Sequence, residues 1–200
     1  MNKDLLLELN NYWINFRNQD LEFIDESEDS PIIYTYGTTP IETFQKVIEN
    51  TKKPKRFIVL GSSIGWQCFF WNSLFPDIPT VGYEIHDFRF DFSCHIADKY
   101  ELNNITLIND TLESADIQDG DLIWQNNLCI PEEIIDNFNW KVLTRNKNIQ
   151  IISYTPVLMN YKDSNDNILL MDYNNNLNTF HQKVIEYPVS WTEKQPFYII

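Results

Sequence analysis

Apolar residues recur at helical spacing in several parts of this chain. Leu5, Leu6, Leu9, Trp13 and Phe16 share one helix face, so residues 2–18 are expected to form an amphipathic helix. Three later segments also have the pattern of helices: 39–51, 65–75 and 87–101. Residues 20–30 hold six acids and no base, which favours a solvated loop, with a landing strip for a basic substrate as the alternative.

The helix expected at 39–51 follows residues typical of a helix start. Thr38 or Thr39 is the expected N-cap, because a threonine hydroxyl can accept from the first free amides. Pro40 is tolerated in the first turn, where its missing N–H costs nothing. The segment KKPK at 52–55 is expected to end the helix.

Short apolar runs between these segments predict strands. Five of them alternate with helices, which implies parallel pairing with right-handed crossovers: 56–61, 80–85, 105–110, 121–127 and 149–156. Two closing strands at 180–191 and 197–200 are expected to form an antiparallel hairpin around residues 192–196. The stretch from 160 to 178, rich in Asn and Asp, predicts a loop or short hairpin.

A length of 200 residues predicts one α/β domain with a sizeable core. Residues 1–33 would be an N-terminal helix and acidic loop, and 34–200 the ligand-binding core. The net charge of −14 argues against direct nucleic-acid binding and favours a basic partner. No apolar run is long enough for a membrane span.

Three scattered cysteines and three scattered histidines indicate neither a disulfide nor a metal site. We therefore expect an intracellular protein, cytoplasmic or, in a eukaryote, nuclear.

Polar residues follow four of the expected parallel strands directly. They are Gly61–Trp66, Glu84, Asp110 and Gln125–Asn127. Because ligands of doubly wound sheets lie beyond the carboxyl ends of the strands, one ligand could touch all four segments. As alternatives, the glycines serve helix packing, Glu84 is a helix-end charge, and the asparagines bond local backbone.

These four segments suit an adenosine-containing cofactor. Gly61 and Gly65 allow close approach, Glu84 can accept from a ribose diol, and Asp110 from an adenine amine. The loop GSSIG lacks the central glycine of a dinucleotide site, and no Walker lysine is present. S-adenosyl-L-methionine, which has no phosphate, is the better fit.

With these motifs in place, the chain resembles the disruptor-of-telomeric-silencing (Dot-type) histone-lysine N-methyltransferase family. YGTT resembles the family's Y-G-E-T lid, VLGSSIGWQ its D-L-G-S-G-V-G-Q, and GYE its G-V-E. NDT is similar to G-D-F, QNNL to V-N-N-F, and VSWTEKQPFYI to V-S-W-T-G-K-P-V-S-Y-Y. The matches run in order from residue 34 to residue 200.

The resemblance implies a Rossmann-like class I methyltransferase fold that binds S-adenosyl-L-methionine. Its sheet would be mostly parallel and seven-stranded, with an antiparallel C-terminal hairpin and helices on both faces. The implied cofactor-binding residues are Tyr36, Thr38, Thr39, Gly61, Ser62, Ser63, Gly65, Gln67, Glu84, Asp110, Thr111 and Asn126. The implied catalytic residues are Asn126 and Tyr198.

The expected reaction is methyl transfer to a lysine amine of a basic protein or peptide. Asn126 would orient the amine through its side-chain oxygen or neighbouring carbonyls. Tyr198, with Trp124 or Phe197, would line an aromatic channel for the lysine stem. Trp191 and Tyr198 have core packing in an edge strand as their alternative role. No histidine base is evident, so the lysine proton would pass to solvent or to a mobile carboxylate.

Several residues depart from the family pattern. Val59 stands where the family has an acid, and Ser63 replaces the middle glycine. Thr38 replaces the lid glutamate, and Thr111 an aromatic residue. Two alternatives therefore remain: a methyltransferase for a small-molecule acceptor, or a degenerate cofactor-binding or scaffolding protein without activity.

Overall fold

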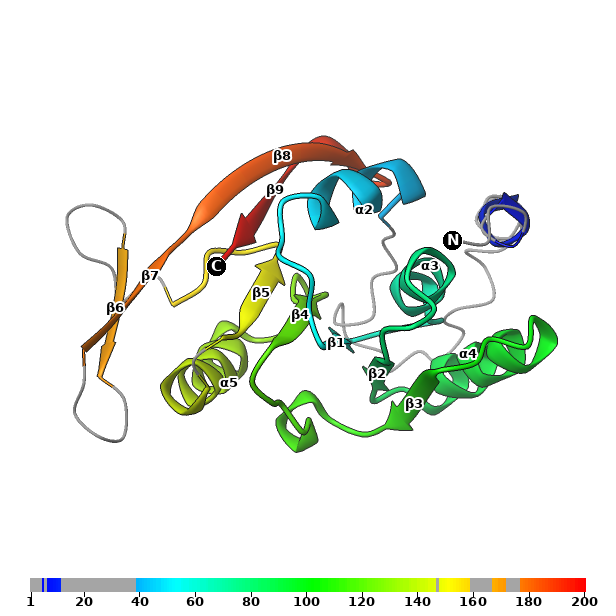
Figure 1. Cartoon of the computed structure of the whole chain (residues 1–200), viewed down its shortest axis with the longest axis horizontal. Coiled ribbons are helices and arrows are strands. Elements are labelled where there is room, and N and C mark those ends of the chain that lie inside the picture. The colour runs from blue at the N-terminus through cyan, green and yellow to red at the C-terminus, as the bar shows by residue number, and fades with distance from the viewer. Residues whose placement is uncertain (1–4, 6, 12–38, 147, 159–166, 172–176) are drawn as a thin grey trace, which may run out of the picture.

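The frame of the molecule is a seven-stranded sheet in the order β3-β2-β1-β4-β5-β9-β8 (Figure 1). The computed structural model describes residues 5, 7–11, 39–146, 148–158, 167–171 and 177–200. The strands are β1 Arg56–Leu60, β2 Thr80–Glu84, β3 Ile105–Asn109, β4 Asp121–Gln125, β5 Gln150–Ser153, β8 Lys183–Val189 and β9 Thr192–Ile199. β1 to β5 pair in parallel, and β9 is antiparallel to both of its neighbours. The predicted fold class is confirmed.

Helices cover both faces of this sheet, as predicted. They are α2 Ile41–Ile48, α3 Trp66–Leu74, α4 Asp87–Lys99 and α5 Glu132–Arg145, with a 3-10 turn, η2, at Leu112–Ser114. The sequence analysis missed α5, although Ile135, Phe138 and Val142 recur there at helical spacing and are buried. In the described part of the chain, no helix has both the length and the apolar composition needed to cross a bilayer.

Strand alternation divides the core into two layers. Phe57, Val59, Leu122, Trp124 and Phe197 are fully buried with α2, α3 and α4 on one side, here called the α3 face. Leu9, from the helical residues 7–11, packs into the same cluster. The intervening residues, such as Ile58, Ile123 and Ile151, pack with α5 on the other side, the α5 face.

A separate hairpin extends the α5 face. β6 (Asn167–Met171) pairs antiparallel with β7 (Leu177–His181), so the hairpin expected at 160–178 is present but ends at His181, inside the predicted closing strand. Ile168 and Leu170 are buried beside α5. β6 and β7 are visible on the left of Figure 1, and the chain then continues into β8.

The closing hairpin turns earlier than predicted. Residues 192–196, expected to be its loop, belong to β9, and Val189 pairs with Thr192 across a turn at Ser190 and Trp191. A register irregularity between Tyr187 and Val189 accommodates this tight turn. Trp191 therefore lies in the turn, 42% exposed, rather than in the core.

The predicted cap of α2 is also wrong. The N-cap position is Pro40, with no side-chain cap hydrogen bond. The Thr39 hydroxyl instead bonds the phenol of Tyr154, 115 residues further along the chain. A tertiary contact has taken the polar group that a local rule assigns to the helix end.

Gly82 marks a close approach between β2 and α3. A Cβ at this position would lie 2.8 Å from the Cys68 sulfur and 3.1 Å from the Ser62 Cβ. Cys68 is fully buried at this contact, and the burial raises the pKa of its thiol well above the ordinary value. The thiol therefore stays protonated and inert.

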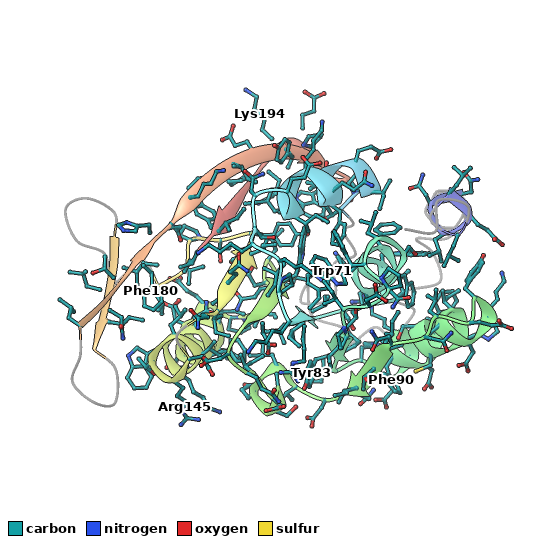
Figure 2. All side chains as sticks on the ribbon, in the orientation of Figure 1. Trp71, Tyr83, Phe90, Arg145, Phe180 and Lys194 are labelled. Atoms are coloured by element: carbon teal, nitrogen blue, oxygen red, sulfur yellow. The ribbon has the colours of Figure 1, made fainter. Side chains whose placement is uncertain are left out.

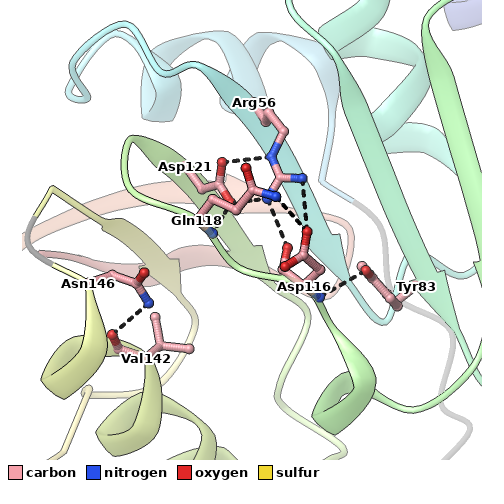
Figure 3. A network of polar contacts seen from close by, with 7 residues as sticks. All are labelled: Arg56, Tyr83, Asp116, Gln118, Asp121, Val142 and Asn146. Atoms are coloured by element: carbon pink, nitrogen blue, oxygen red, sulfur yellow. Dashed lines mark hydrogen bonds and ion pairs between the residues drawn. The ribbon is translucent and has the colours of Figure 1, made fainter.

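A fork of hydrogen bonds ties β1 to β4 at their start (Figure 3). Arg56 donates to both carboxylate oxygens of Asp121, at 2.9 and 2.6 Å, and to the Asp116 carbonyl at 2.8 Å. The Asp121 side chain is 1% exposed, and Gln118 N–H also donates to it at 2.8 Å. The hydrogen bonds from Arg56 to Asp121 raise the pKa of Arg56 above its ordinary value.

We expect Arg56→Met to lower the free energy of unfolding by about 3–5 kcal/mol, because it leaves the buried Asp121 carboxylate without its cation. Urea unfolding at neutral pH measures this. Asp116→Asn is the matched control: its side chain is 70% exposed, so we expect a change below about 1 kcal/mol. A loss from Arg56→Met no larger than that from Asp116→Asn would contradict the role of the fork.

Candidate functional site at the carboxyl ends of the strands

The loop after β1 is a tight turn that opens α3. Gly61, Ser63 and Gly65 have φ values of +68°, +51° and +89°. The Gly65 N–H donates to the Ser62 carbonyl at 2.8 Å, and Ser62 N–H to the Tyr83 carbonyl at 2.8 Å, which joins the loop to β2. Ser63 takes the left-handed conformation with a Cβ present, a cost of about 1 kcal/mol that glycine would avoid.

Glu84 ends β2 beside this loop. Its side chain is buried, and one carboxylate oxygen accepts from the Ser63 N–H at 2.6 Å. The other accepts from the His86 N–H at 2.9 Å, at the start of α4. The structure thus brings Glu84 and Ser63 together. Each oxygen keeps a second lone pair for a further donor.

Asp110 and Thr111 lie next along the same end of the sheet. The Asp110 N–H donates to the Glu84 carbonyl at 3.2 Å, so β3 delivers Asp110 beside Glu84. The Asp110 carboxylate is exposed and accepts from the Thr111 N–H at 2.7 Å. The carboxylate can reach a ligand from solvent without any rearrangement of the core.

Asn126 joins three elements through its side-chain amide. Its Nδ2 donates to the Gly61 carbonyl at 2.7 Å. Its Oδ1 accepts from Trp124 Nε1 at 3.1 Å and from Gln67 Nε2, on α3, at 3.3 Å. The structure therefore brings Gly61, Gln67 and Asn126 together, and these bonds fix the loop after β1 against β4.

The other two residues of QNN point elsewhere. Gln125 is fully buried, and its Nε2 donates to Asn139 of α5 at 2.6 Å. Asn127 donates to the Ser153 hydroxyl at 3.0 Å and accepts from the Tyr154 N–H at 3.1 Å. Asn127 therefore holds the end of β4 to the segment that follows β5.

Tyr154 is a site residue that sequence reasoning missed. Its ring is buried against Trp124 and Phe197, and its hydroxyl bonds the Thr39 hydroxyl. Burial raises the pKa of Tyr154 to about 12, while hydrogen bonds with Thr39, Trp124 and Gln67 lower it by less. The signal was available, because Tyr154 follows a parallel strand directly, as Asn126 does.

Tyr154 also meets the closing hairpin. Trp191 lies edge-on to its ring at 5.8 Å, and Trp191 Nε1 donates to Gln195 Oε1 at 3.2 Å. Gln195 Nε2 in turn donates to the Tyr154 carbonyl at 3.2 Å. The VSWT segment therefore lies beside the carboxyl end of β5, and Gln195 was the second residue missed.

The structure does not bring Tyr198 and Asn126 together. Phe197 and Ile199 point into the α3 face, so Tyr198 between them points to the α5 face, opposite Ser153. The Asn126 amide lies among α3-face residues. The predicted aromatic channel of Tyr198 with Trp124 or Phe197 is wrong, because the latter two are fully buried core residues on the other face.

Tyr36 and Thr38 lie outside the described residues. Thr39, the last residue of YGTT, is 2% exposed and contacts Tyr154. Within the described ranges, no group of three or more His, Cys, Asp or Glu side chains is arranged to hold a metal ion.

Comparison with known proteins gives relatives by structure alone. No protein-family model matches the chain, and no curated protein matches its sequence. The SAH-bound methyltransferase PaMTH1 of Podospora anserina has a TM-score of 0.53 at 17% identity, over 75% of this chain and 61% of its own. Precorrin-6y C5,15-methyltransferase of Geobacter metallireducens GS-15 has a TM-score of 0.49 at 12% identity, over 90% and 93%.

A third solved structure, YcgJ of Bacillus subtilis, has a TM-score of 0.42 at 14% identity over 56% of this chain. The chain spans about half of YcgJ, 51% of its length. At these identities, the likeness to PaMTH1 shows the fold alone. That fold is the Rossmann-like α/β fold of class I methyltransferases.

We expect Tyr154→Phe to lower the free energy of unfolding at pH 7 by about 1–3 kcal/mol, because it removes a hydrogen bond and leaves the buried Thr39 hydroxyl unpaired. The folded-state pKa of about 12 exceeds the ordinary value of 10.0, so the phenol stabilises the fold fully below pH 10. That contribution is lost as the pH rises from 10 to 12. Urea unfolding at pH 7, 10 and 11 should show the two proteins converging; a constant difference would contradict this account.

Proposed function

We propose that this chain is an S-adenosyl-L-methionine-dependent methyltransferase of the Dot-like type. One observation carries the proposal: the Glu84 carboxylate, at the end of β2, lies 2.6 Å from the Ser63 amide of the glycine loop. An acid of the kind that holds a ribose therefore lies beside a tight turn, which supports the proposal.

The residues present fit this cofactor. The Ser62 and Ser63 hydroxyls are buried and, among the described residues, have no hydrogen-bond partner. Glu84 has free lone pairs, and Asp110 is exposed one strand further along. Glu84 would hold the ribose, Asp110 and Thr111 the adenine, and the loop from Gly61 to Gly65 would lie against the nucleoside.

S-adenosyl-L-methionine supplies an electrophilic methyl group when bound. The work of the chain is then to align an acceptor with that methyl and to exclude water. Asn126 acts here mainly as a positioning residue, because its amide holds Gly61 and Gln67. Its backbone carbonyl and the Trp191 ring are the groups left to orient an amine. The Tyr154 phenol remains neutral at pH 7, so it is not a base.

We further propose a lysine amine of a basic protein or peptide as the acceptor. Acids gather at the carboxyl end of the sheet and at the helix starts beside it, where Arg89 also lies. They are Glu84, Asp87, Asp110, Glu113, Glu132 and Glu133. Acids at helix starts also complement the helix dipoles, and Glu84 itself accepts from the His86 N–H at the start of α4, but the acids here still outnumber Arg89. This end therefore attracts a cationic substrate.

A cofactor-binding protein without activity is the second candidate. Both oxygens of Glu84 already accept from backbone amides, and Val59 is a fully buried core residue where the resembled family has an acid. A small-molecule acceptor on the same fold is an outcome of the test below.

Two experiments test the proposal. The first is calorimetric titration with S-adenosyl-L-methionine and S-adenosylhomocysteine. The second measures transfer of labelled methyl to histones, other lysine-rich proteins and a set of small amines. We expect binding and methyllysine in the hydrolysed protein. No heat at about 1 mM ligand would favour the inactive candidate. Label confined to the small amines would remove the protein-lysine acceptor while retaining the methyltransferase.

We expect Glu84→Ala to weaken cofactor binding by about 1.5–3 kcal/mol, a factor of about 10–150, because hydrogen bonds to a charged group are lost. Calorimetry measures the affinity. Thermal unfolding measures the loss of stability that accompanies the loss of the hydrogen bonds to Ser63 and His86. Glu113→Ala, in the 3-10 turn η2 at the same end, is the control. An affinity equal to that of the control would leave Glu84 as a helix-end charge.

We expect Asn126→Ala to lower kcat by about tenfold or more, with a smaller change in cofactor affinity, because small displacements of aligned groups are costly. Single-turnover kinetics and calorimetry separate the two effects. Asn103→Ala, an exposed asparagine at the other end of the sheet, is the control. Equal losses in kcat and affinity would reduce Asn126 to support of the cofactor loop.

A further inference from the structure

A cavity lies at the opposite end of the sheet from the candidate site. Its volume is about 290 Å³, and its lining residues come from the end of α2, the segment before β1, the end of α3 and the segment before β2: Ile48, Thr51, Lys52, Lys53, Pro54, Trp71, Phe75 and Ile78. The lining includes no residue assigned above to the cofactor or the acceptor, so this cavity is separate from the proposed active site.

One wall of the cavity is aromatic and fixed by packing. The Trp71 ring stacks on Phe57 of β1, with centroids 4.3 Å apart and planes at 14°. Its other neighbour is Phe75, 4.5 Å away and 38% exposed. Figure 2 labels Trp71 where α3 lies over the sheet. The aromatic wall therefore exists before any ligand arrives.

Another part of the lining, at Thr51 and Lys52, is held by hydrogen bonds. The Lys52 N–H donates to the Gln150 side chain at 2.6 Å, and that side chain donates back to the Lys52 carbonyl at 3.0 Å. The Thr51 hydroxyl donates to the Ile48 carbonyl at 2.7 Å. Because the backbone of this part of the lining is already ordered, binding here involves little further loss of conformational entropy.

The polar groups of the cavity favour an anion. Its charged lining residues, Lys52 and Lys53, are both cationic, in a chain of net charge −14. The rest of the lining is mainly apolar, with Trp71, Phe75 and Ile78 among its residues. Apolar walls with two exposed lysines suit a ligand with an apolar body and an anionic head.

We propose that this cavity binds a small aromatic carboxylate. A volume of about 290 Å³ matches the lower end of ligand pockets, which begin near 300 Å³. A protein partner needs about 800 Å² of surface on each side, whereas Phe75 is the large exposed apolar residue of this lining. The ring would lie against Phe75 and Ile78, and the carboxylate would pair with Lys52 and Lys53.

Titration of ¹⁵N-labelled protein with 3-phenylpropanoate tests the proposal, read from the indole N–H resonance of Trp71 and assigned with Trp71→Phe. We expect that resonance to shift with saturation. Lys52→Gln with Lys53→Gln should weaken binding about fivefold or more, because exposed ion pairs contribute up to about 1 kcal/mol each. The neutral amide 3-phenylpropanamide should bind more weakly by a similar factor.

Lys141→Gln, an exposed lysine of α5, is the matched control and should leave the dissociation constant unchanged. No shift of the Trp71 resonance up to about 10 mM carboxylate would overturn the site. Equal affinity for carboxylate and amide, or for the double lysine variant and the parent, would overturn its anionic specificity. Each of these readouts is independent of methyl transfer, so the proposed function can fail while this site stands.

Discussion

The hydrogen bonds of the Asn126 side chain are the constraint on which the candidate site depends. They join the loop after β1 to α3 and β4, three elements that meet at this end of the sheet. The loop also packs on β4, since a Cβ on Gly61 would be in van der Waals contact with the Asn126 carbonyl oxygen, at 3.5 Å. The loop contains residues in left-handed conformations, and such backbone persists only where its surroundings hold it.

Further hydrogen bonds, made by Tyr154 and Gln195, connect more segments at this end of the sheet. Tyr154 connects Thr39, before α2, with the residues that follow β5, and Gln195 connects Tyr154 with the closing hairpin. Segments more than one hundred residues apart thus share one cluster. Its phenol and amide groups are buried, where an unpaired partner is costly, so the cluster fixes the relative positions of these segments.

Much of the fold follows from patterns that a single sequence carries. Alternating apolar runs and helical segments gave five parallel strands, and polar residues at strand ends gave Gly61, Glu84 and Asn126. Two local predictions were wrong because contacts that no local rule describes replaced them. Thr39 bonds Tyr154 instead of capping α2, and residues 192–196 pair with β8 as part of β9 instead of forming a loop.

The aromatic residues show a different lesson. Period-two alternation along β9 separates Tyr198 from Phe197, and along β4 it places Trp124 on the α3 face. Applying that period to β9 would have excluded Phe197 as a partner of Tyr198. Tyr154 would have been found by extending the rule for strand ends to the fifth strand. Residues between 12 and 38 lie outside the described structure and hold Tyr36 and Thr38.

The tight fit of Cys68 against Gly82 has a practical consequence for spectroscopy. A thiol enclosed in this way does not react with maleimides or oxidants while the protein is folded. Cys94, on α4, and Cys129, beyond β4, are both partly exposed, and burial together with the nearby acids Asp91 and Asp98 raises the pKa of the Cys94 thiol. Cys129 is therefore the natural attachment point for a fluorophore, and it lies only three residues beyond Asn126.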